Sequence, residues 1–480
     1  MKFFSNILFS SSSKTAGKSP SSRGEIDGIK HQIKRSNSTR NWRRWFGYDP
    51  DPSDLIGEYI ASKIADKLSA SIYLDHELSE DAELSPKVEL VLDEKKRELK
   101  LASKYLNDGA KLPDQSPKFL GGTLDEVWAW MEGKIEIAKG HAIISANPSS
   151  GSIEEENKLL KCGEKLKTTI CGKKVEMTLE KKQLFQALKL SFALGDHDVN
   201  PGNMYVVYDK EKQKSQICRI DYGHAFSDLI KKWGKGRDHS PSIEPGKGVV
   251  LDALNRTKVN GGKSKLARDY RGIIPDHDFA SELRKDVDQP AIREGIRECS
   301  KELDAFYKSK GNKLGRLKHK ITKCFSTLSS RMGFGKMKEQ DAILQKTGDF
   351  VESNLEEMKS IANLVDIQAY IEDVTNGSLS PAEGAKKIQE CYAKDIKYLL
   401  RKSPSDEVEW VRTDKDESSL KCSLHEYIAK AIERNPEAKQ QLSNLSSILP
   451  KQEEKRVIGK FTKKALNNAG KQEIKKDIII

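Results

Sequence analysis

Apolar positions recur at helical spacing in several segments of the chain. In the first of these segments, Ile56, Ile60 and Ile64 lie four residues apart, and Asp54 stands before them as a candidate N-cap. One face of an α-helix repeats every three to four residues, so this pattern predicts a helix over 55–68. The same spacing predicts further helices over 178–194, 292–306 and 351–365.

Alternation of apolar and polar positions predicts strands elsewhere. The segments 88–92 and 99–103 alternate on either side of the polar sequence DEKKR, which predicts a β-hairpin. The sequence MYVVY over 204–208 follows Pro201, which excludes a continuing α-helix, and is typical of a strand. A second strand is expected over 216–220.

Beyond about residue 290 the pattern is helical throughout. Ser380 and Glu383 form a capping box around Pro381, which predicts the start of another helix. We therefore expect an α+β fold followed by an all-helical C-terminal region over 290–480, and a disordered basic tail over 1–24.

Composition narrows the class of protein and its partners. The formal net charge is +12, which favours anionic partners such as ATP phosphates, phosphoinositide head groups or an acidic membrane surface. The seven cysteines include no CxxC pair, so neither a zinc finger nor a disulfide framework is expected, and a reducing, cytoplasmic compartment is favoured. No segment has the ~18 consecutive apolar residues of a membrane-spanning helix.

The candidate chemistry lies in the sequence DVNPGN, from Asp198 to Asn203, and in DYG, which begins at Asp221. Phosphoryl transfer needs a carboxylate near the attacking hydroxyl and oxygen ligands that hold Mg²⁺ or Mn²⁺ on the phosphates. Asp198 suits the first role, and Asn203 and Asp221 suit the second. For Asp196 we favour a solvated turn over a second acid in the site.

These motifs resemble those of known kinases. DVNPGN resembles the kinase catalytic-loop pattern D-x-x-x-x-N, with His197 just before the aspartate as in H-R-D kinases, and RIDYGHAF over 219–226 resembles the metal-binding strand of phosphatidylinositol 3- and 4-kinases. The segment is also similar to HipA-type serine kinases. The resemblance implies a two-lobed protein-kinase-like fold that binds ATP and magnesium, with Asp198 and His197 as catalytic residues. It implies an N-lobe over 25–106 and a C-lobe over 107–280.

The lysine that contacts ATP has two candidates. In the favoured alignment Lys34 lies on a strand and Glu58, on the helix that follows, is its partner. In the other, Lys104 takes this role with Glu126. Both satisfy the requirement for a strand lysine and a helical glutamate.

The acceptor is expected to be a phosphoinositide, with no specific nucleic-acid partner. The basic loop after DYG would hold the lipid phosphates, through Lys231, Lys232, Lys235 and Arg237. A Ser/Thr protein kinase is the alternative, followed by a nucleotide-binding pseudokinase and by a metal phosphohydrolase of the HD type. The basic head and divergent motifs suggest, by analogy, a bacterial effector kinase that acts inside a host cell.

Overall fold

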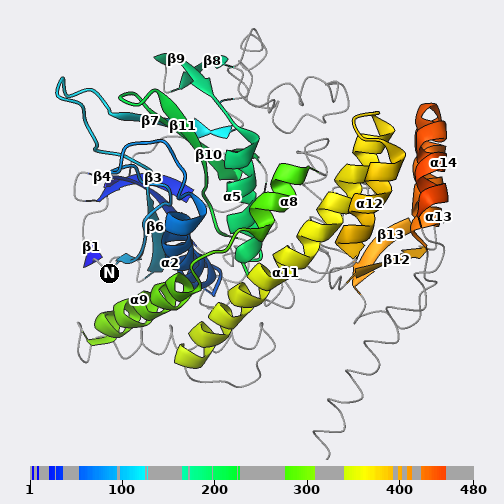
Figure 1. Ribbon diagram of the computed structural model, residues 1–480. Helices are drawn as coiled ribbons and strands as arrows, with labels where there is room; N and C mark the ends of the chain where they lie inside the picture. Colours follow the sequence, from blue (N-terminus) through cyan, green and yellow to red (C-terminus); the bar gives the residue numbers. More distant parts are fainter. Residues whose placement is uncertain are drawn as a thin grey trace, which may run out of the picture. The chain divides into compact units, whose positions relative to one another are not determined.

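The computed structural model (Figure 1) describes residues 3–4, 8–9, 21–26, 29–35, 53–93, 98–124, 127, 165–170, 173–196, 198–199, 201–223, 225–226, 276–308, 340–392, 398–402, 408–412 and 423–449. The chain divides into two compact units, and the main division falls within helix α11, after Ala362. The first unit holds the described residues up to 362, apart from 276 and 277. These two residues and all those from Asn363 onwards belong to the second unit.

A six-stranded sheet forms the amino-terminal part of the first unit. Its strand order is β1-β5-β6-β4-β3-β2, and every neighbouring pair is antiparallel except β1 with β5. The strands are β1 (Phe3–Phe4), β2 (Leu8–Phe9), β3 (Ser21–Ile26), β4 (Ile29–Arg35), β5 (Val88–Asp93) and β6 (Glu98–Lys104). The predicted hairpin is confirmed as β5 and β6, whereas β1, β2 and the start of β3 fall in the segment for which we expected a tail.

Alternation along β4 gives the sheet two different faces. Ile33 is fully buried with Val91 and Ala102 in an apolar cluster on one face. The neighbouring Lys34 therefore projects to the other face, where it meets Glu58 of helix α2 (Ser53–Ile72). The predicted helix is confirmed, although it begins before Asp54.

A three-stranded sheet of order β11-β10-β7 forms the next part of the unit. Its strands are β7 (Phe119–Thr123), β10 (Met204–Asp209) and β11 (Lys214–Arg219), and helix α5 (Lys181–Ala193) packs on β11. β10, β11 and α5 match the predicted elements. Gly121 allows the ring of Tyr205 to lie across β7, because a Cβ atom there would overlap that ring. The hairpin β8 (Lys165–Ile170) and β9 (Lys173–Thr178) was not predicted.

Helices complete the first unit. They are α8 (His277–Arg284, of which His277 belongs to the second unit), α9 (Gln289–Lys308) and the first part of α11 (Gln340–Thr375). The compact unit thus extends beyond the expected end of the kinase lobes near residue 280. Helices α9 and α11 match the predicted helical spacing, but α9 and the first part of α11 belong to the same compact unit as the sheets instead of forming a separate module.

The described residues of the second unit are helical apart from one hairpin that the sequence pattern did not predict. It contains the end of α11, α12 (Pro381–Tyr392), the paired strands β12 (Tyr398–Lys402) and β13 (Val408–Arg412), α13 (Leu424–Arg434), η5 (Pro436–Ala438) and α14 (Lys439–Ile448). Half of the predicted capping box is present at the start of α12: the amide of Glu383 donates to the hydroxyl of Ser380 at 3.3 Å, and that hydroxyl donates to Oε2 of Glu383 at 2.6 Å.

The α+β class with a mainly helical C-terminal region is confirmed. Among the helices that the structure describes, none has a stretch apolar enough, over sufficient length, to traverse a bilayer.

Candidate active site

The site centres on Lys34, which projects from β4. Its ammonium nitrogen lies 2.6 Å from Oε1 of Glu58 and 2.6 Å from Oδ1 of Asp221. The side chains of Lys34 and Glu58 are 6% and 7% exposed, whereas that of Asp221 is 40% exposed. The two buried charges thus neutralise each other, and Asp221 presents part of its carboxylate to solvent.

Electrostatics keep these groups ionised. Burial alone would lower the pKa of Lys34, but the charges of Asp221 and Glu58 outweigh it and raise that pKa above its ordinary value. Burial would raise the pKa of Asp221, yet Lys34 and Arg219 bring it below its ordinary value. Lys34 is therefore a cation and Asp221 an anion at neutral pH.

The backbone of the DYG segment has an uncommon conformation and lies close to Glu58. Asp221 has a φ of +59°, in the left-handed region that side chains other than glycine seldom adopt. The amide of Gly223 donates to Asp221 Oδ1 at 3.1 Å, and a Cβ on Gly223 would lie 3.4 Å from Oε2 of Glu58. A backbone held in an uncommon conformation beside charged groups is characteristic of functional sites.

The loop between α5 and β10 carries Asp198 and Asn203. The short helix η3 (Pro201–Asn203) turns the chain into β10. The Nδ2 atom of Asn203 donates to the carbonyl oxygen of Asp198 at 2.7 Å, which fixes the amide and assigns its oxygen to the other side. The backbone of this loop thus sets the spacing between the two functional side chains.

A buried ion pair holds the loop. The guanidinium of Arg219 lies 3.0 Å from Oδ2 of Asp196, and both side chains are 0% exposed. Arg219 also donates to the carbonyl oxygens of Asp198, Asn203 and Ile220, at 3.1, 2.7 and 2.6 Å respectively. One side chain at the end of β11 therefore fixes the loop that carries Asp198 and Asn203 against the strand that leads to Asp221.

Asp196 corrects one of our sequence interpretations. We had favoured a solvated turn, but its carboxylate is completely buried, and it also accepts from the amide of Asp198 at 2.9 Å. Sequence reasoning missed Arg219 as well. A basic residue directly before the I-D-Y-G segment is the signal that could have identified it.

The oxygen ligands fit a magnesium ion. Asn203 offers an amide oxygen and Asp221 a carboxylate, and Mg²⁺ prefers such hard oxygen ligands. The described residues contain no group of three His, Cys, Asp or Glu side chains that would enclose a metal. At a Mg²⁺ site held by these two residues, the remaining ligands would be water and substrate phosphates.

The remaining predicted site residues either contact other partners or lie outside the described residues. Lys104 forms an ion pair with Glu83 at 2.7 Å, so the structure does not bring it to the cluster of Lys34 and Asp221. Its proposed partner Glu126 lies outside the described residues. So do His197 and the basic loop residues Lys231, Lys232, Lys235 and Arg237.

Comparison with known proteins identifies one partial family match and one structural likeness. The model of the LepB N-terminal domain matches residues 157–235, a stretch that includes Asp198, Asn203 and Asp221 but neither Lys34 nor Glu58. No curated protein matches the chain. The crystal structure of the Helicobacter pylori proinflammatory kinase CtkA is similar at 11% identity, with 75% of this chain and 97% of that chain covered and a TM-score of 0.34.

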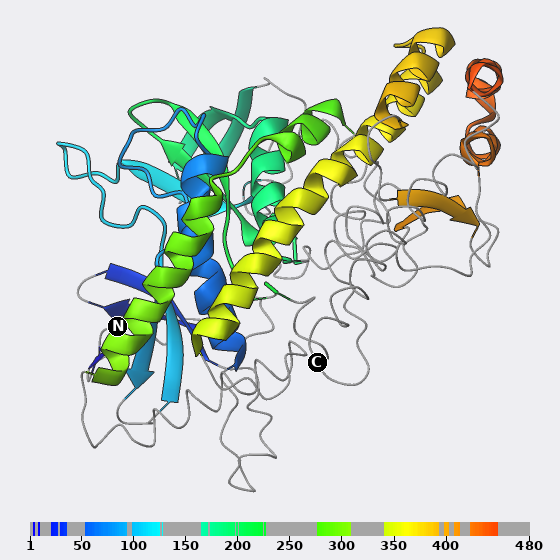
Figure 2. The same ribbon diagram turned by 60° about the horizontal axis from the view of Figure 1, so that its bottom comes forward.

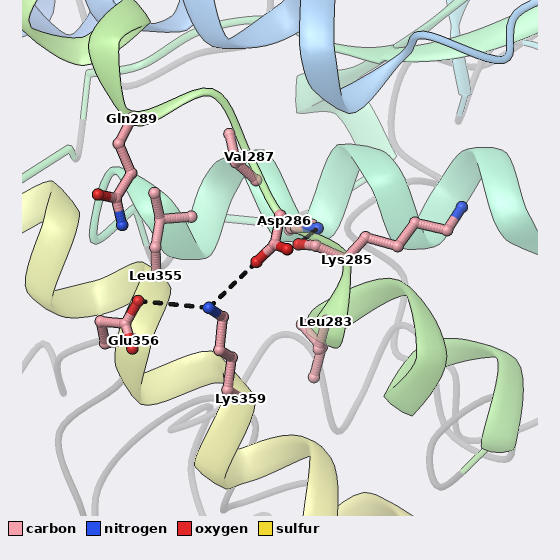
Figure 3. Close-up of a pocket in the computed structure, with 9 residues that line it drawn as sticks. Leu283, Lys285, Asp286, Val287, Gln289, Leu355, Glu356 and Lys359 are labelled. Carbon is pink, nitrogen blue, oxygen red and sulfur yellow. Dashed lines mark hydrogen bonds and ion pairs between the residues drawn. The ribbon is translucent and has the colours of Figure 1, made fainter.

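A separate small pocket lies between α5, α8 and α11 of the first unit (Figure 3). Three of its charged side chains are paired with one another: the ammonium of Lys359 lies 3.1 Å from Asp286 and 3.4 Å from Glu356. None of the predicted site residues lines this pocket.

Proposed function

We propose that this chain is an ATP- and magnesium-dependent kinase that transfers the γ-phosphate of ATP to a hydroxyl group. The observation that supports this most strongly is the contact of Lys34 with both Glu58 and Asp221. Phosphoryl transfer uses a strand lysine paired with a helical glutamate, together with an aspartate that binds metal. Asp198 and Asn203 follow α5 in the order that the same chemistry requires.

Each residue has its own task. Lys34 binds phosphate oxygens of ATP, and Glu58 keeps its ammonium in place. Asp198 accepts the proton of the attacking hydroxyl. Asn203 and Asp221 hold the metal ion, which neutralises the charge on the phosphates when bound.

For the acceptor we favour a phosphoinositide over a protein serine or threonine. The proposal draws on the resemblance of RIDYGHAF to lipid-kinase sequences and on the net charge of +12, which favours an anionic surface. The four basic residues Lys231, Lys232, Lys235 and Arg237 would bind the head-group phosphates. As a bacterial effector, the chain would act in the cytoplasm of a host cell.

The first test measures ATP turnover. Purified chain is incubated with labelled ATP, Mg²⁺ and either phosphoinositide vesicles or a generic basic protein. Asp198→Asn and Asp221→Asn should each lower turnover by about 100-fold or more, because each removes a group needed in the transition state. Asp349→Asn, at an exposed position on α11, is the matched control and should retain activity.

The acceptor that becomes labelled decides between lipid and protein. Label in the protein alone would overturn the phosphoinositide assignment and leave the kinase standing. Absence of ATP turnover with both acceptors would sink the kinase proposal in favour of a pseudokinase. Metal-dependent phosphomonoesterase activity without ATP would favour the HD-type phosphohydrolase.

The basic loop is tested separately. Joint replacement of Lys231, Lys232, Lys235 and Arg237 by alanine should abolish lipid labelling and spare ATP hydrolysis. Unchanged lipid turnover would exclude these residues from head-group binding.

A further inference from the structure

Helix α9 lies along helix α2, the helix that carries Glu58 (Figures 1 and 2). We propose that α9, held in turn by α11, is a brace within the chain that positions Glu58 against Lys34. This inference rests on the proposed kinase site. It assigns a role to helices that sequence analysis had placed in a separate module.

The contact between the helices is charged and regularly spaced. The ammonium of Lys63 lies 2.7 Å from Glu302 and 3.2 Å from Glu298. One turn further along, that of Lys67 lies 3.0 Å from Glu294 and 3.2 Å from Glu298. Each cation thus bridges two successive carboxylates of α9, so a sliding movement of α2 by one turn would leave charges mispaired.

Tyr59 of α2 adds a buried contact with α9 beside these ion pairs. It is 1% exposed, and its hydroxyl donates to the carboxylate of Glu302. Glu58 is the adjacent residue, and it faces Lys34. Because neighbouring residues of a helix point about 100° apart, α2 presents the catalytic glutamate on one side and its contact with α9 on another. Rotation that withdrew Glu58 would break the hydrogen bond of Tyr59.

The backbones of α2 and α9 approach closely at Gly295. A Cβ at this position would lie 3.0 Å from Cα of Ile64 and 3.0 Å from the carbonyl oxygen of Lys63. Both of these atoms belong to the backbone of α2, so no side-chain rotation could relieve the contact. A larger residue at position 295 must therefore push the helices apart.

Helix α11 holds α9 from a further side. A Cβ on Gly348 would overlap Cδ1 of Ile296, and Arg293 of α9 forms an ion pair with Glu352 at 3.1 Å. The same part of α11 reaches the end of α5, where Nδ2 of Asn354 donates to the carbonyl oxygen of Ala193 at 3.1 Å. The brace therefore connects the helix of Glu58 with the end of α5, from which the loop of Asp198 begins.

The test disrupts the brace by charge and by size. Glu298→Lys together with Glu302→Lys places like charges opposite each other, and Gly295→Leu wedges the helices apart. Each variant should lose about tenfold in kcat/KM for ATP turnover. Adding Glu294→Lys, Lys63→Glu and Lys67→Glu should restore most of the loss in the charge variant, since the pairs between the two helices are then recreated with the signs exchanged. Arg297→Glu with Lys301→Glu, at exposed positions of α9, is the control and should leave turnover unchanged.

A positioning role is separated from general stability by a double-mutant cycle. In the Glu58→Gln background the charge reversal should cost no more than about twofold, because the group it positions is already gone. An equal loss in both backgrounds, or a matching fall in melting temperature that explains the loss, would overturn the brace.

A second readout does not depend on activity. The rate at which an amine-reactive anhydride modifies Lys34, followed by mass spectrometry, should rise in the brace variants and stay at the wild-type value in the control. If the wild type turns over no ATP, the proposed function fails while the labelling rate still tests the brace. An unchanged rate in both brace variants would contradict the brace itself.

Discussion

The ammonium nitrogen of Lys34 lies 2.6 Å from Oδ1 of Asp221, although 187 positions separate the two residues in sequence. Lys34 is on β4 of the six-stranded sheet, and Asp221 follows β11 of the three-stranded sheet. The contact therefore joins the six-stranded and the three-stranded sheet of the first unit at the candidate site. Lys34 itself is buried, so removing its carboxylate partners would leave a buried charge without compensation.

Lys34→Met should abolish ATP-dependent turnover, with a loss of about 100-fold or more. It should also lower the free energy of unfolding by about 3 kcal/mol, because Glu58 is left buried without its cation. Steady-state kinetics and urea unfolding measure the two effects. Lys104→Met is the matched control, since Lys104 pairs with Glu83. If Lys104→Met removed activity and Lys34→Met did not, the alignment with Lys104 and Glu126 would be the right one.

Breaking the ion pair of Arg219 and Asp196 should lower the free energy of unfolding more than most substitutions do. Replacing Arg219 by methionine leaves the buried carboxylate of Asp196 without its cation and removes one donor from each of three carbonyl oxygens. We expect a loss of about 3 to 5 kcal/mol in the free energy of unfolding, measured by urea denaturation. Asp196→Asn combined with Arg219→Met should cost less than the sum of the single changes. Additive losses would show that the two groups do not act as a pair.

The secondary-structure elements around the site could be predicted from the sequence, because each pattern lies within a short segment. The alternation of β10, the break at Pro201 and the spacing from Asp198 to Asn203 lie within a few residues of one another. Local sequence therefore places them on one loop. The order of strand, helix and hairpin along the chain also allowed us to predict Lys34 and Glu58 as a pair.

Contacts between residues that lie far apart in the sequence could not be predicted. Asp196 looks like a solvated turn residue until Arg219, from a later strand, encloses it. Lys34 and Lys104 both lie on strands, and only their spatial neighbours, Asp221 and Glu83, distinguish them. The spacing of α9 predicts a helix with a buried face, but it does not reveal that α2 covers that face.

His277 should stabilise the second unit most strongly in mild acid. Its Nδ1 lies 2.6 Å from Asp366 and its Nε2 lies 3.2 Å from Asp373, and the ring lies against Tyr370 with centroids 4.2 Å apart. The hydrogen bond to Asp366 outweighs burial and raises the pKa of His277 above its ordinary value. A group whose pKa is raised by folding stabilises fully below its unfolded pKa, and loses that contribution as pH rises through its folded pKa.

We therefore expect His277→Gln to lower the melting temperature most near about pH 6 and progressively less at higher pH, as the imidazolium of the wild type is lost. Thermal unfolding of both proteins between about pH 6 and 9 measures this difference. His425→Gln is the control, since the ring of His425 hydrogen-bonds to the carbonyl oxygen of Leu449 at 3.2 Å. A deficit of His277→Gln that stays constant across this range would refute the charged pairing.

The contribution of Lys189 to stability should depend on pH in the opposite sense, becoming more favourable as pH rises. Its side chain is 2% exposed in the pocket of Figure 3, and its ammonium donates to the carbonyl oxygens of Glu282 and Lys285 at 2.7 and 2.8 Å. Burial lowers the pKa of Lys189 to about 8, with the charge of Glu282 only partly opposing it. Between that value and its unfolded pKa of 10.5 the unfolded chain binds the extra proton, so the folded state gains stability as pH rises.

Relative to Lys189→Met, the wild type should therefore gain on the order of 2 kcal/mol in the free energy of unfolding between pH 7 and 10. Urea unfolding of both proteins at a series of pH values measures this difference, in which titrations common to the two proteins cancel. Lys182→Met is the matched control, because Lys182 lies on the same helix but is 43% exposed and pairs with Asp75. If the difference between wild type and Lys189→Met did not change with pH, Lys189 would have to remain charged in its buried position, held by the two carbonyl oxygens and Glu282.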